Sequence, residues 1–389
     1  MICWSWHVIS RLPQKGRKMK KLAIVVLVLI PALVAAGIAC ADTWRFAAFG
    51  DSRGGSITEN SGSDMGVRSS VLSAIVKSVQ ADQVDLVVFS GDEVDGRAKY
   101  GSMEAQLKKW KKIMQPLVDA NIPVYAFRGN HEENEQEGSE TSEDPVKAWE
   151  KAIGDTMIDH TTDKIRQLPG VKPFLTYSID HKNARFVCFD QYIGRSKTYD
   201  STKYDSNVNY GVVNGWVLQQ IQQAQSPWVF AFGHEPAFIL HHTDCMANAP
   251  IERDDLWDAL GSKGGIFICG HDHMYVRCTA PDAAGNDVTE IVSAAAGAPL
   301  YPYDNKKLNE KIDVRVVPED KFVNAHGGTP NTNGLPAYFG YTLVTIEGDT
   351  ATFEFKAFKN YDYKKWVAPE EPDFVTIDRW ITKAKRTDD

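Results

Sequence analysis

Five apolar segments in this chain of 389 residues are each followed by a loop in which glycine precedes a side chain that can bind a metal. The loops contain GD, GD, GNH, GH and GHDH, and the side chains concerned are Asp51, Asp92, Asn130, His234, His271 and His273. Carboxylate and amide oxygens, together with imidazole nitrogens, suit borderline divalent metals such as zinc, manganese and iron. One interpretation of the loops is therefore a metal site whose ligands lie far apart in sequence.

Each loop taken singly has a simpler interpretation. An aspartate after glycine is more often a turn residue than a ligand, and a histidine at a strand end is often buried with its hydrogen bonds satisfied. Five such loops in one chain favour the metal site. The histidines without this context, such as His160, His181, His326 and the pair His241-His242, are interpreted as surface residues or as neighbours of the ligands.

The elements that must position these loops can be predicted from the pattern of apolar residues. The segments before the loops have the valine, isoleucine and phenylalanine content of buried strands. Helices are expected in three places: from about 66 to 79, directly after the second loop, and near 216 to 224. A hairpin is expected at Gly348-Asp349. FLTYSID and ARFVCFDQY predict an antiparallel pair. Ligands of open α/β sheets collect at the carboxyl ends of strands, so the loops should meet there.

Composition limits the classes of partner. Apolar residues make up 43% of the chain, enough to bury a large core, and the formal net charge is −8. A nucleic-acid surface needs a concentrated basic patch, and the one basic cluster lies at the N-terminus, so no nucleic-acid partner is expected. We expect a single domain over 42–389, with an acidic insertion near 132–170 whose first part, 132–148, is solvated.

The N-terminus has the form of a secretory signal. A basic cluster over 15–21 precedes an apolar run over 22–38 and the small residues Ala39-Cys40-Ala41. Residues 1–41 are therefore interpreted as an N-terminal extension and signal peptide, with Met19 as an alternative start. Cleavage after Ala41 predicts a periplasmic or secreted protein. A lipoprotein anchored at Cys40 is the alternative, while the short run containing Pro31 disfavours an uncleaved membrane helix.

Four cysteines follow this leader. Cys188 and Cys269 lie in apolar, strand-like segments and are expected to be buried free thiols. Cys245 and Cys278 each follow a histidine-bearing loop, so a disulfide between them is considered for an oxidising compartment. The sequence leaves that pairing open.

The order and form of the five loops, from about residue 45 to 278, resemble the calcineurin-like metallophosphoesterases, which include purple acid phosphatases and Ser/Thr phosphatases. The resemblance implies an α/β (α+β) fold, a four-layer αββα sandwich of two mixed β-sheets flanked by helices, with the metal site at the carboxyl ends of strands. The C-terminal strands would belong to the second sheet.

The resemblance also implies two metal ions, with Mn, Fe or Zn as candidates. Asp92 would bridge them, because a carboxylate has two oxygens and partly offsets the repulsion between two cations. One metal would also be bound by Asn130, His234 and His271. The other would be bound by Asp51 and His273.

One residue departs from the family pattern. The first loop of the family is commonly Asp-x-His, whereas this chain has Asp51-Ser52-Arg53, and a guanidinium is not a metal ligand. Asp95 could coordinate instead, water could fill the gap, or the metal could be held loosely while Arg53 binds phosphate. We favour water together with phosphate binding by Arg53. The absent tyrosine of G-D-x-x-Y disfavours the purple subtype.

The implied reaction is hydrolysis of a phosphoester by a metal-bound hydroxide. His131 would be the general acid, and Asp95 would hold its tautomer. The enzyme would act on a small phosphorylated substrate, as a phosphomonoesterase or a phosphodiesterase. The alternative is an exported, metal-dependent protein that binds phosphorylated ligands with little or no turnover.

Selectivity is expected to depend on the loops 132–170, 193–210 and 241–251. Tyr275 and the pair His241-His242 could line the cleft or could have ordinary surface roles.

Overall fold

The computed structural model describes residues 43–54, 64–133, 144–154, 156–158, 161–170, 174–192, 210–301, 313–316, 329–330, 336–362 and 368–385. The chain divides into two compact units, Met1–Cys40 and Ala41–Asp389, and every described residue belongs to the second unit. The predicted signal peptide, its cleavage site and Cys40 therefore lie outside the described residues.

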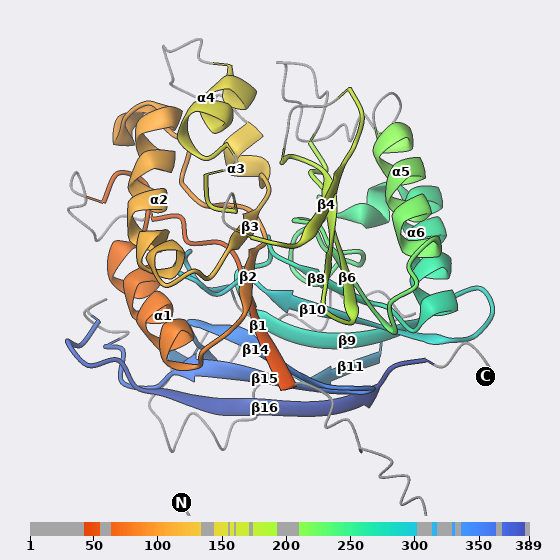
Figure 1. Ribbon diagram of the computed structural model, residues 1–389. Helices are drawn as coiled ribbons and strands as arrows, with labels where there is room; N and C mark the ends of the chain where they lie inside the picture. Colours follow the sequence, from red (N-terminus) through yellow and green to blue (C-terminus); the bar gives the residue numbers. More distant parts are fainter. Residues whose placement is uncertain are drawn as a thin grey trace, which may run out of the picture. The chain divides into compact units, whose positions relative to one another are not determined.

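Two mixed β-sheets form the centre of the second unit (Figure 1). One has the strand order β16-β15-β14-β1-β2-β3 and the other β11-β9-β10-β8-β7-β6-β5-β4, while β12 and β13 pair separately. The strands are β1 (Thr43–Phe49), β2 (Leu86–Phe89), β3 (Val124–Ala126), β4 (Lys164–Gln167), β5 (Tyr177–His181), β6 (Ala184–Cys188), β7 (Trp228–Phe232), β8 (Ile266–Cys269), β9 (Tyr275–Pro281), β10 (Asp287–Ser293), β11 (Asp313–Val316), β12 (Thr329–Pro330), β13 (Pro336–Ala337), β14 (Gly340–Glu347), β15 (Thr350–Phe358) and β16 (Phe374–Lys383).

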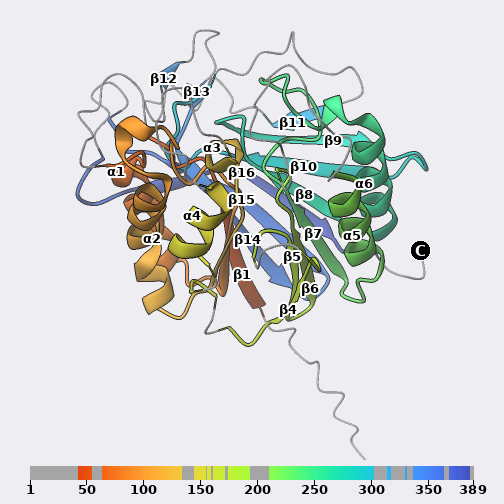
Figure 2. The same cartoon turned by 90° about the horizontal axis from the view of Figure 1, so that it is seen from above.

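Helices cover the two sheets from opposite sides. α1, α2 and α4 lie on one side and α5 and α6 on the other, with the sheets between them (Figure 2). The helices are α1 (Ser69–Ala81), α2 (Met103–Asp119), α3 (Asn130–Glu133), α4 (Pro145–Ala152), α5 (Tyr210–Gln222) and α6 (Pro250–Lys263), with short 3₁₀ turns η2 (Ala98–Tyr100) and η3 (Met246–Asn248). The predicted α/β fold with two mixed sheets flanked by helices is confirmed.

Aromatic side chains join the inner faces of the sheets. The ring centroids of Phe46 on β1 and Phe186 on β6 are 5.0 Å apart, and Phe46 lies at the same distance from Phe230 on β7. All three residues are fully buried. Edge contacts of this kind add to the stabilisation from apolar burial, so this core holds the ends of β1 and β7, and the loops that follow them, close together.

The predicted elements occur with shifted ends. α1 begins later than expected. The helix expected after the second loop is α2, which buries an apolar stripe that includes Leu107 and Trp110. Ser102 caps α2, because its Oγ accepts a hydrogen bond from the backbone N–H of Ala105 at 3.2 Å. The predicted antiparallel pair is β5 and β6, and the hairpin at Gly348-Asp349 joins β14 to β15.

The prediction of a solvated segment over 132–148 is wrong in part. Residues 134–143 lie outside the described residues, but Glu132 is buried, and α4, which begins at Pro145, buries Ala148 together with the following Trp149. Asp144 caps this helix through Oδ1, which accepts from the N–H groups of Val146 and Lys147. The acidic composition concealed a short amphipathic helix that packs against α2.

The four cysteines after the leader are all free and buried, so the disulfide considered between Cys245 and Cys278 is not formed. Cys278 is on β9, and its Sγ lies 3.3 Å from Oε2 of the buried Glu290 on β10. Burial raises the pKa of the Cys245 and Cys278 thiols, which makes both less reactive.

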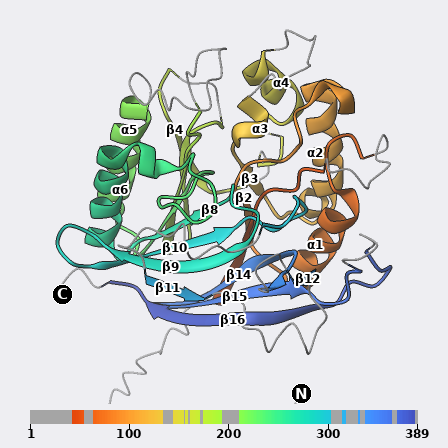
Figure 3. The same cartoon turned by 180° about the vertical axis from the view of Figure 1, so that it is seen from behind.

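Tyr275 does not line a cleft. Its ring stacks on Phe355 of β15 with centroids 4.1 Å apart, and its hydroxyl donates to Asp378 on β16 at 2.6 Å. Figure 3 shows β9 lying over β15 and β16. This tyrosine therefore joins the two sheets.

Candidate metal centre

The six predicted ligands follow five strands that end at the same edge of the two sheets. Asp51 follows β1, Asp92 follows β2, Asn130 follows β3, His234 follows β7, and His271 and His273 follow β8. Asn130 is half-buried and the others are buried. The structure therefore brings together all six residues that the sequence singled out.

Four of these side chains converge on one point, which we name the Asn130 position and which consists of Asp92, Asn130, His234 and His271. Oδ1 of Asn130 lies 3.1 Å from Nε2 of His234 and 3.1 Å from Nδ1 of His271. Nε2 of His234 lies 3.3 Å from Oδ1 of Asp92. These atoms come from four loops, and oxygen and nitrogen donors this close together fit a divalent metal.

A second group, the Asp51 position, consists of Asp51, Asp92 and His273. Their ligand atoms all lie within 4.8 Å of one another, and Nε2 of His273 is 3.5 Å from Oδ1 of Asp51. Arg53 lies beside this group, with its Nε 3.4 Å from Oδ2 of Asp92. The Asp51 position therefore has three donors and a neighbouring cation.

Backbone carbonyls fix the tautomers of two candidate ligands. Nδ1 of His234 lies 2.8 Å from the carbonyl oxygen of Ser90, and Nδ1 of His273 lies 2.8 Å from that of Pro299. In each ring Nδ1 therefore carries the proton and Nε2 faces the centre without one. Burial lowers the pKa of His234 to about 4 and that of His273 well below its usual range, which favours the neutral form that binds metals.

His271 is oriented differently. Its Nε2 lies 3.4 Å from Oδ1 of Asp244, which leaves Nδ1 to face Asn130. Burial lowers the pKa of His271, but the contact with the Asp244 carboxylate outweighs it and raises the pKa to about 10. A carboxylate behind a ligating imidazole makes the ring a more basic donor.

The two carboxylates of the centre are held close together. Burial and the charge of Asp92 raise the pKa of Asp51 well above its usual range. Burial also acts to raise the pKa of Asp92, but His131, His234 and Arg53 outweigh it and lower the pKa to about 2. Asp92 is therefore the carboxylate that stays ionised between both positions.

Three of the candidate ligands have a strained backbone. Asp51, Asp92 and His271 have φ angles of 61°, 55° and 70°, in the left-handed region that non-glycine residues rarely adopt. Strain of this kind persists where the surrounding structure requires it, commonly at functional sites.

The glycine of the third loop is required by close packing. A Cβ on Gly129 would lie 2.3 Å from Oδ1 of Asp92 and 2.4 Å from its backbone nitrogen. We expect Gly129→Ala to displace Asp92 and to weaken metal binding at the Asn130 position by ~10 to 100-fold, the cost usual for disturbing the support of a ligand. Metal titration of the purified variant measures this. Gly215→Ala on α5, where a Cβ meets open space, is the control, and equal metal affinity in both variants would contradict the argument.

His131 is buried next to Asn130. Its Nδ1 lies 2.6 Å from the backbone carbonyl of Asp95, and its Nε2 lies 3.9 Å from Oδ2 of Asp92. Burial and the charge of Arg53 lower the pKa of His131 to about 3. The tautomer is therefore held by the main-chain carbonyl of Asp95 and not by its side chain.

The Asp95 carboxylate faces two arginines. Its Oδ1 lies 3.5 Å from Nε of Arg97, and its Oδ2 lies 4.0 Å from Nη1 of Arg53. Of the predicted catalytic residues, Asp95 thus contacts His131 through its backbone and Arg53 through its side chain.

Glu132 is a further residue of this centre that the sequence did not predict. Its buried carboxylate accepts hydrogen bonds from the backbone N–H groups of Asp92, Val94 and Gly129, at 3.0, 2.9 and 2.8 Å. It therefore ties the loop after β2 to the loop after β3. Its position directly after the GNH tripeptide is the sequence feature from which it could have been predicted.

Tyr301 was also missed. Its ring lies between His241 and His273, with centroids 4.4 and 4.2 Å away and interplanar angles of 10° and 15°. Its hydroxyl lies 3.4 Å from Nη2 of Arg53. The pair His241-His242, left open by the sequence, therefore does lie at this centre.

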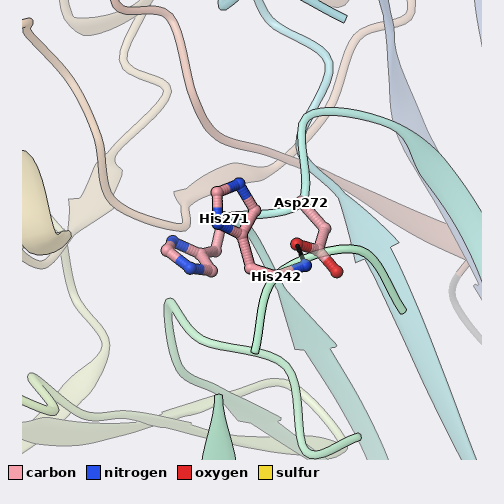
Figure 4. A group of neighbouring side chains, drawn as sticks. All are labelled: His242, His271 and Asp272. Atoms are coloured by element: carbon pink, nitrogen blue, oxygen red, sulfur yellow. Dashed lines mark hydrogen bonds between the residues drawn. The ribbon is translucent and has the colours of Figure 1, made fainter. Parts of the chain in front are cut away.

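His242, His271 and Asp272 also lie within metal-binding distance of one another (Figure 4). The carboxylate oxygens of Asp272 accept the backbone N–H groups of His241 and His242, at 2.9 and 3.0 Å. Because both oxygens already hold this loop in place, Asp272 is a structural residue.

Comparisons with known proteins agree with this geometry. The sequence model of a family described as calcineurin-like phosphoesterase matches residues 62–275, more than half of the chain. No curated protein matches the chain. Within the described ranges, none of the helices combines the length and the hydropathy needed to cross a membrane.

Solved structures show the same fold. A purple acid phosphatase from yellow lupin (Lupinus luteus) seeds is 16% identical with a TM-score of 0.54, and the match covers 88% of this chain and 54% of the lupin chain. PhoD is 12% identical with a TM-score of 0.56, and the match covers 89% of this chain and 70% of PhoD. This chain thus spans about half the length of the lupin protein.

Proposed function

Because this chain belongs to the calcineurin-like phosphoesterase family, we propose that it hydrolyses phosphoesters of small molecules at a metal centre formed by the Asn130 and Asp51 positions. The observation that carries the proposal is the convergence of Asp92, Asn130, His234 and His271. Oδ1 of Asn130 lies 3.1 Å from a ring nitrogen of each histidine, and Nε2 of His234 lies 3.3 Å from Oδ1 of Asp92. Mn, Fe and Zn are the candidate ions. The chemistry that bound metals supply is a water of lowered pKa and neutralisation of phosphate charge.

Asp92 is proposed to serve both metal positions. Its Oδ1 faces His234 and accepts the backbone N–H of His131 at 3.0 Å, while its Oδ2 faces Arg53. A carboxylate presented in this way can contribute one oxygen to each position. Asp51 and His273 complete the Asp51 position.

His131 is proposed to protonate the leaving oxygen. Its Nδ1 donates to the Asp95 carbonyl, so Nε2 is the atom that faces the centre. Its low pKa keeps the ring neutral in the free protein, partly because Arg53 is near. A negatively charged phosphate beside Arg53 would offset that cation and favour the protonated ring, which can then donate from Nε2.

Arg53 is proposed to bind a phosphate oxygen. Its side chain is 13% exposed, and its buried Nε is ion-paired with Asp92 at 3.4 Å but makes no hydrogen bond within the described part of the chain, so it can still donate one. We expect Arg53→Ala to weaken competitive inhibition by inorganic phosphate by ~10 to 100-fold, since hydrogen bonds to charged groups are worth about 1.5–3 kcal/mol.

The inhibition constant of phosphate measures this effect directly. Arg97→Ala is the matched control, because Arg97 also pairs with Asp95 but lies 39% exposed. An unchanged inhibition constant in Arg53→Ala would remove Arg53 from the phosphate site.

The test of the function combines elemental analysis with hydrolysis of p-nitrophenyl phosphate and bis-p-nitrophenyl phosphate, before and after addition of Mn, Zn or Fe. Bound metal with turnover on either ester supports a phosphohydrolase, and the preferred ester distinguishes a monoesterase from a diesterase. Bound metal without turnover on any ester would favour the alternative, a protein that binds phosphorylated ligands.

Export remains part of the proposal. We propose that residues 1–41 are removed as a signal peptide, giving a periplasmic or secreted protein, with a lipoprotein anchored at Cys40 as the alternative. N-terminal sequencing of the protein isolated from its native host tests this. A mature protein beginning at Asp42 supports cleavage after Ala41, and an acylated Cys40 supports the anchor.

A further inference from the structure

Arg53 is fixed inside the candidate metal centre by three contacts. Its Nε lies 3.4 Å from Oδ2 of Asp92, its Nη1 4.0 Å from Oδ2 of Asp95, and its Nη2 3.4 Å from the hydroxyl of Tyr301. The guanidinium therefore faces the oxygen of Asp92 that is turned away from the Asn130 position.

The surroundings hold the guanidinium there. The Tyr301 ring stacks on His273, itself a member of the Asp51 position, and its other face is covered by His241. Arg53 also forms an isolated β-bridge with Val67, which anchors its backbone. Both the main chain and the side chain of this residue are thus held at the edge of the Asp51 position.

The two metal positions differ in their donors. The Asn130 position has a carboxylate, an amide and two imidazoles, contributed by Asp92, Asn130, His234 and His271. The Asp51 position has two carboxylates and one imidazole, and the residue that would supply a fourth donor in the family pattern is Arg53. A guanidinium has no lone pair to offer and repels a second cation.

Arg53 also provides the charge that a metal would provide at the Asp51 position. Asp51 and Asp92 are fully buried carboxylates, and the guanidinium of Arg53 lies beside them with its Nε 3.4 Å from Oδ2 of Asp92, so it can offset their negative charge. The planar donors of arginine also match the oxygens of a phosphate group.

We propose, resting on the phosphoesterase function above, that the centre binds one metal tightly, at the Asn130 position, and that Arg53 supplies the positive charge at the Asp51 position. A metal at the Asp51 position is expected to bind more than ~100-fold more weakly than one at the Asn130 position, because it lacks a ligand as well as meeting a cation. The phosphate would then lie between one metal and one guanidinium.

The experiment is a titration of the metal-depleted full chain with Mn²⁺. Calorimetry measures the number and affinity of the bound ions, and electron paramagnetic resonance distinguishes an isolated ion from a coupled pair. The wild-type protein should take up one Mn²⁺ per chain at low metal concentration and give the spectrum of an isolated ion. Arg53→His restores a ligand and removes the cation, so it should take up two ions and give an exchange-coupled spectrum. Arg97→His, a nearby arginine outside the centre, should behave as the wild type.

Several outcomes would overturn the inference. Two ions of similar affinity in the wild type, with a coupled spectrum, would show that Arg53 does not exclude the second metal. A folded Arg53→His that still binds one ion would show that residue 53 does not limit the Asp51 position. Should Arg53→His fail to fold, the wild-type stoichiometry still decides between the two alternatives.

The readouts separate this inference from the proposed function. One tightly bound Mn²⁺ with no hydrolysis of either ester would uphold the inference and reject the esterase. Hydrolysis of either ester by a protein that binds two ions equally tightly would support the esterase and reject the inference about Arg53.

Discussion

Asp92→Asn should remove tightly bound metal and esterase activity together. Asp92 offers Oδ1 to the Asn130 position and Oδ2 to the Asp51 position, so one substitution removes a charged ligand from both. An amide has one neutral oxygen in place of two charged ones. We expect metal content close to zero and a fall in kcat/KM larger than the ~10³-fold that a single stabilising group typically supplies.

Elemental analysis and ester hydrolysis of the same preparation measure this result. Asp378→Asn is the matched control, since Asp378 is also a largely buried carboxylate, bonded to Tyr275 and Arg277 away from the centre. It should keep its metal. A variant Asp92→Asn that retains full metal content and turnover would rule out this carboxylate as a ligand.

His131→Asn should have the opposite pattern, with metal retained and turnover reduced. His131 is absent from both metal positions, and its Nε2 lies 3.9 Å from Asp92 without replacing any donor. Loss of a general acid usually costs ~10² to 10⁴-fold in rate. We therefore expect kcat to fall by at least ~10²-fold at unchanged metal content.

A comparison of esters with different leaving groups tests the role of His131 as a general acid more specifically. An ester whose alcohol is a poor leaving group needs protonation more, so its hydrolysis should fall further in His131→Asn than that of p-nitrophenyl phosphate. His181→Asn is the control, because His181 pairs with Asp163 in another part of the sheet. Loss of metal in His131→Asn would instead make His131 a ligand or a support for the ligands.

Much of the fold could be predicted from the sequence because it depends on local patterns. The apolar segments before each glycine loop predicted the strands, and the helix predicted after the second loop is α2. The helix α4 was not predicted, because the acidic residues before it dominate the composition and Trp149 is the one large side chain among its three buried residues.

The six candidate ligands followed from the sequence for the same reason. Five of them directly follow a glycine at a strand end, and His273 comes two residues after His271. Parallel strands bring such ends together within each of the two sheets. The distances among Asp92, Asn130, His234 and His271 agree with that expectation, while their roles as ligands stay predictions.

Other features depended on contacts between residues far apart in sequence. Tyr301 reaches His273 and Arg53 from the loop after β10, and Tyr275 turns away from the centre to bond Asp378 on the opposite sheet. No local pattern distinguishes these two tyrosines.

The sequence by itself determined the types of donor, their order and the departure at Arg53, because these are properties of the chain. Only the tertiary structure decided that Arg53 lies 3.4 Å from Asp92, that the Asp95 carbonyl holds His131, and that Cys245 and Cys278 stay unpaired. The physical reason is that a residue's type is fixed locally, whereas the direction in which its side chain points is set by the packing of two sheets and their loops around it.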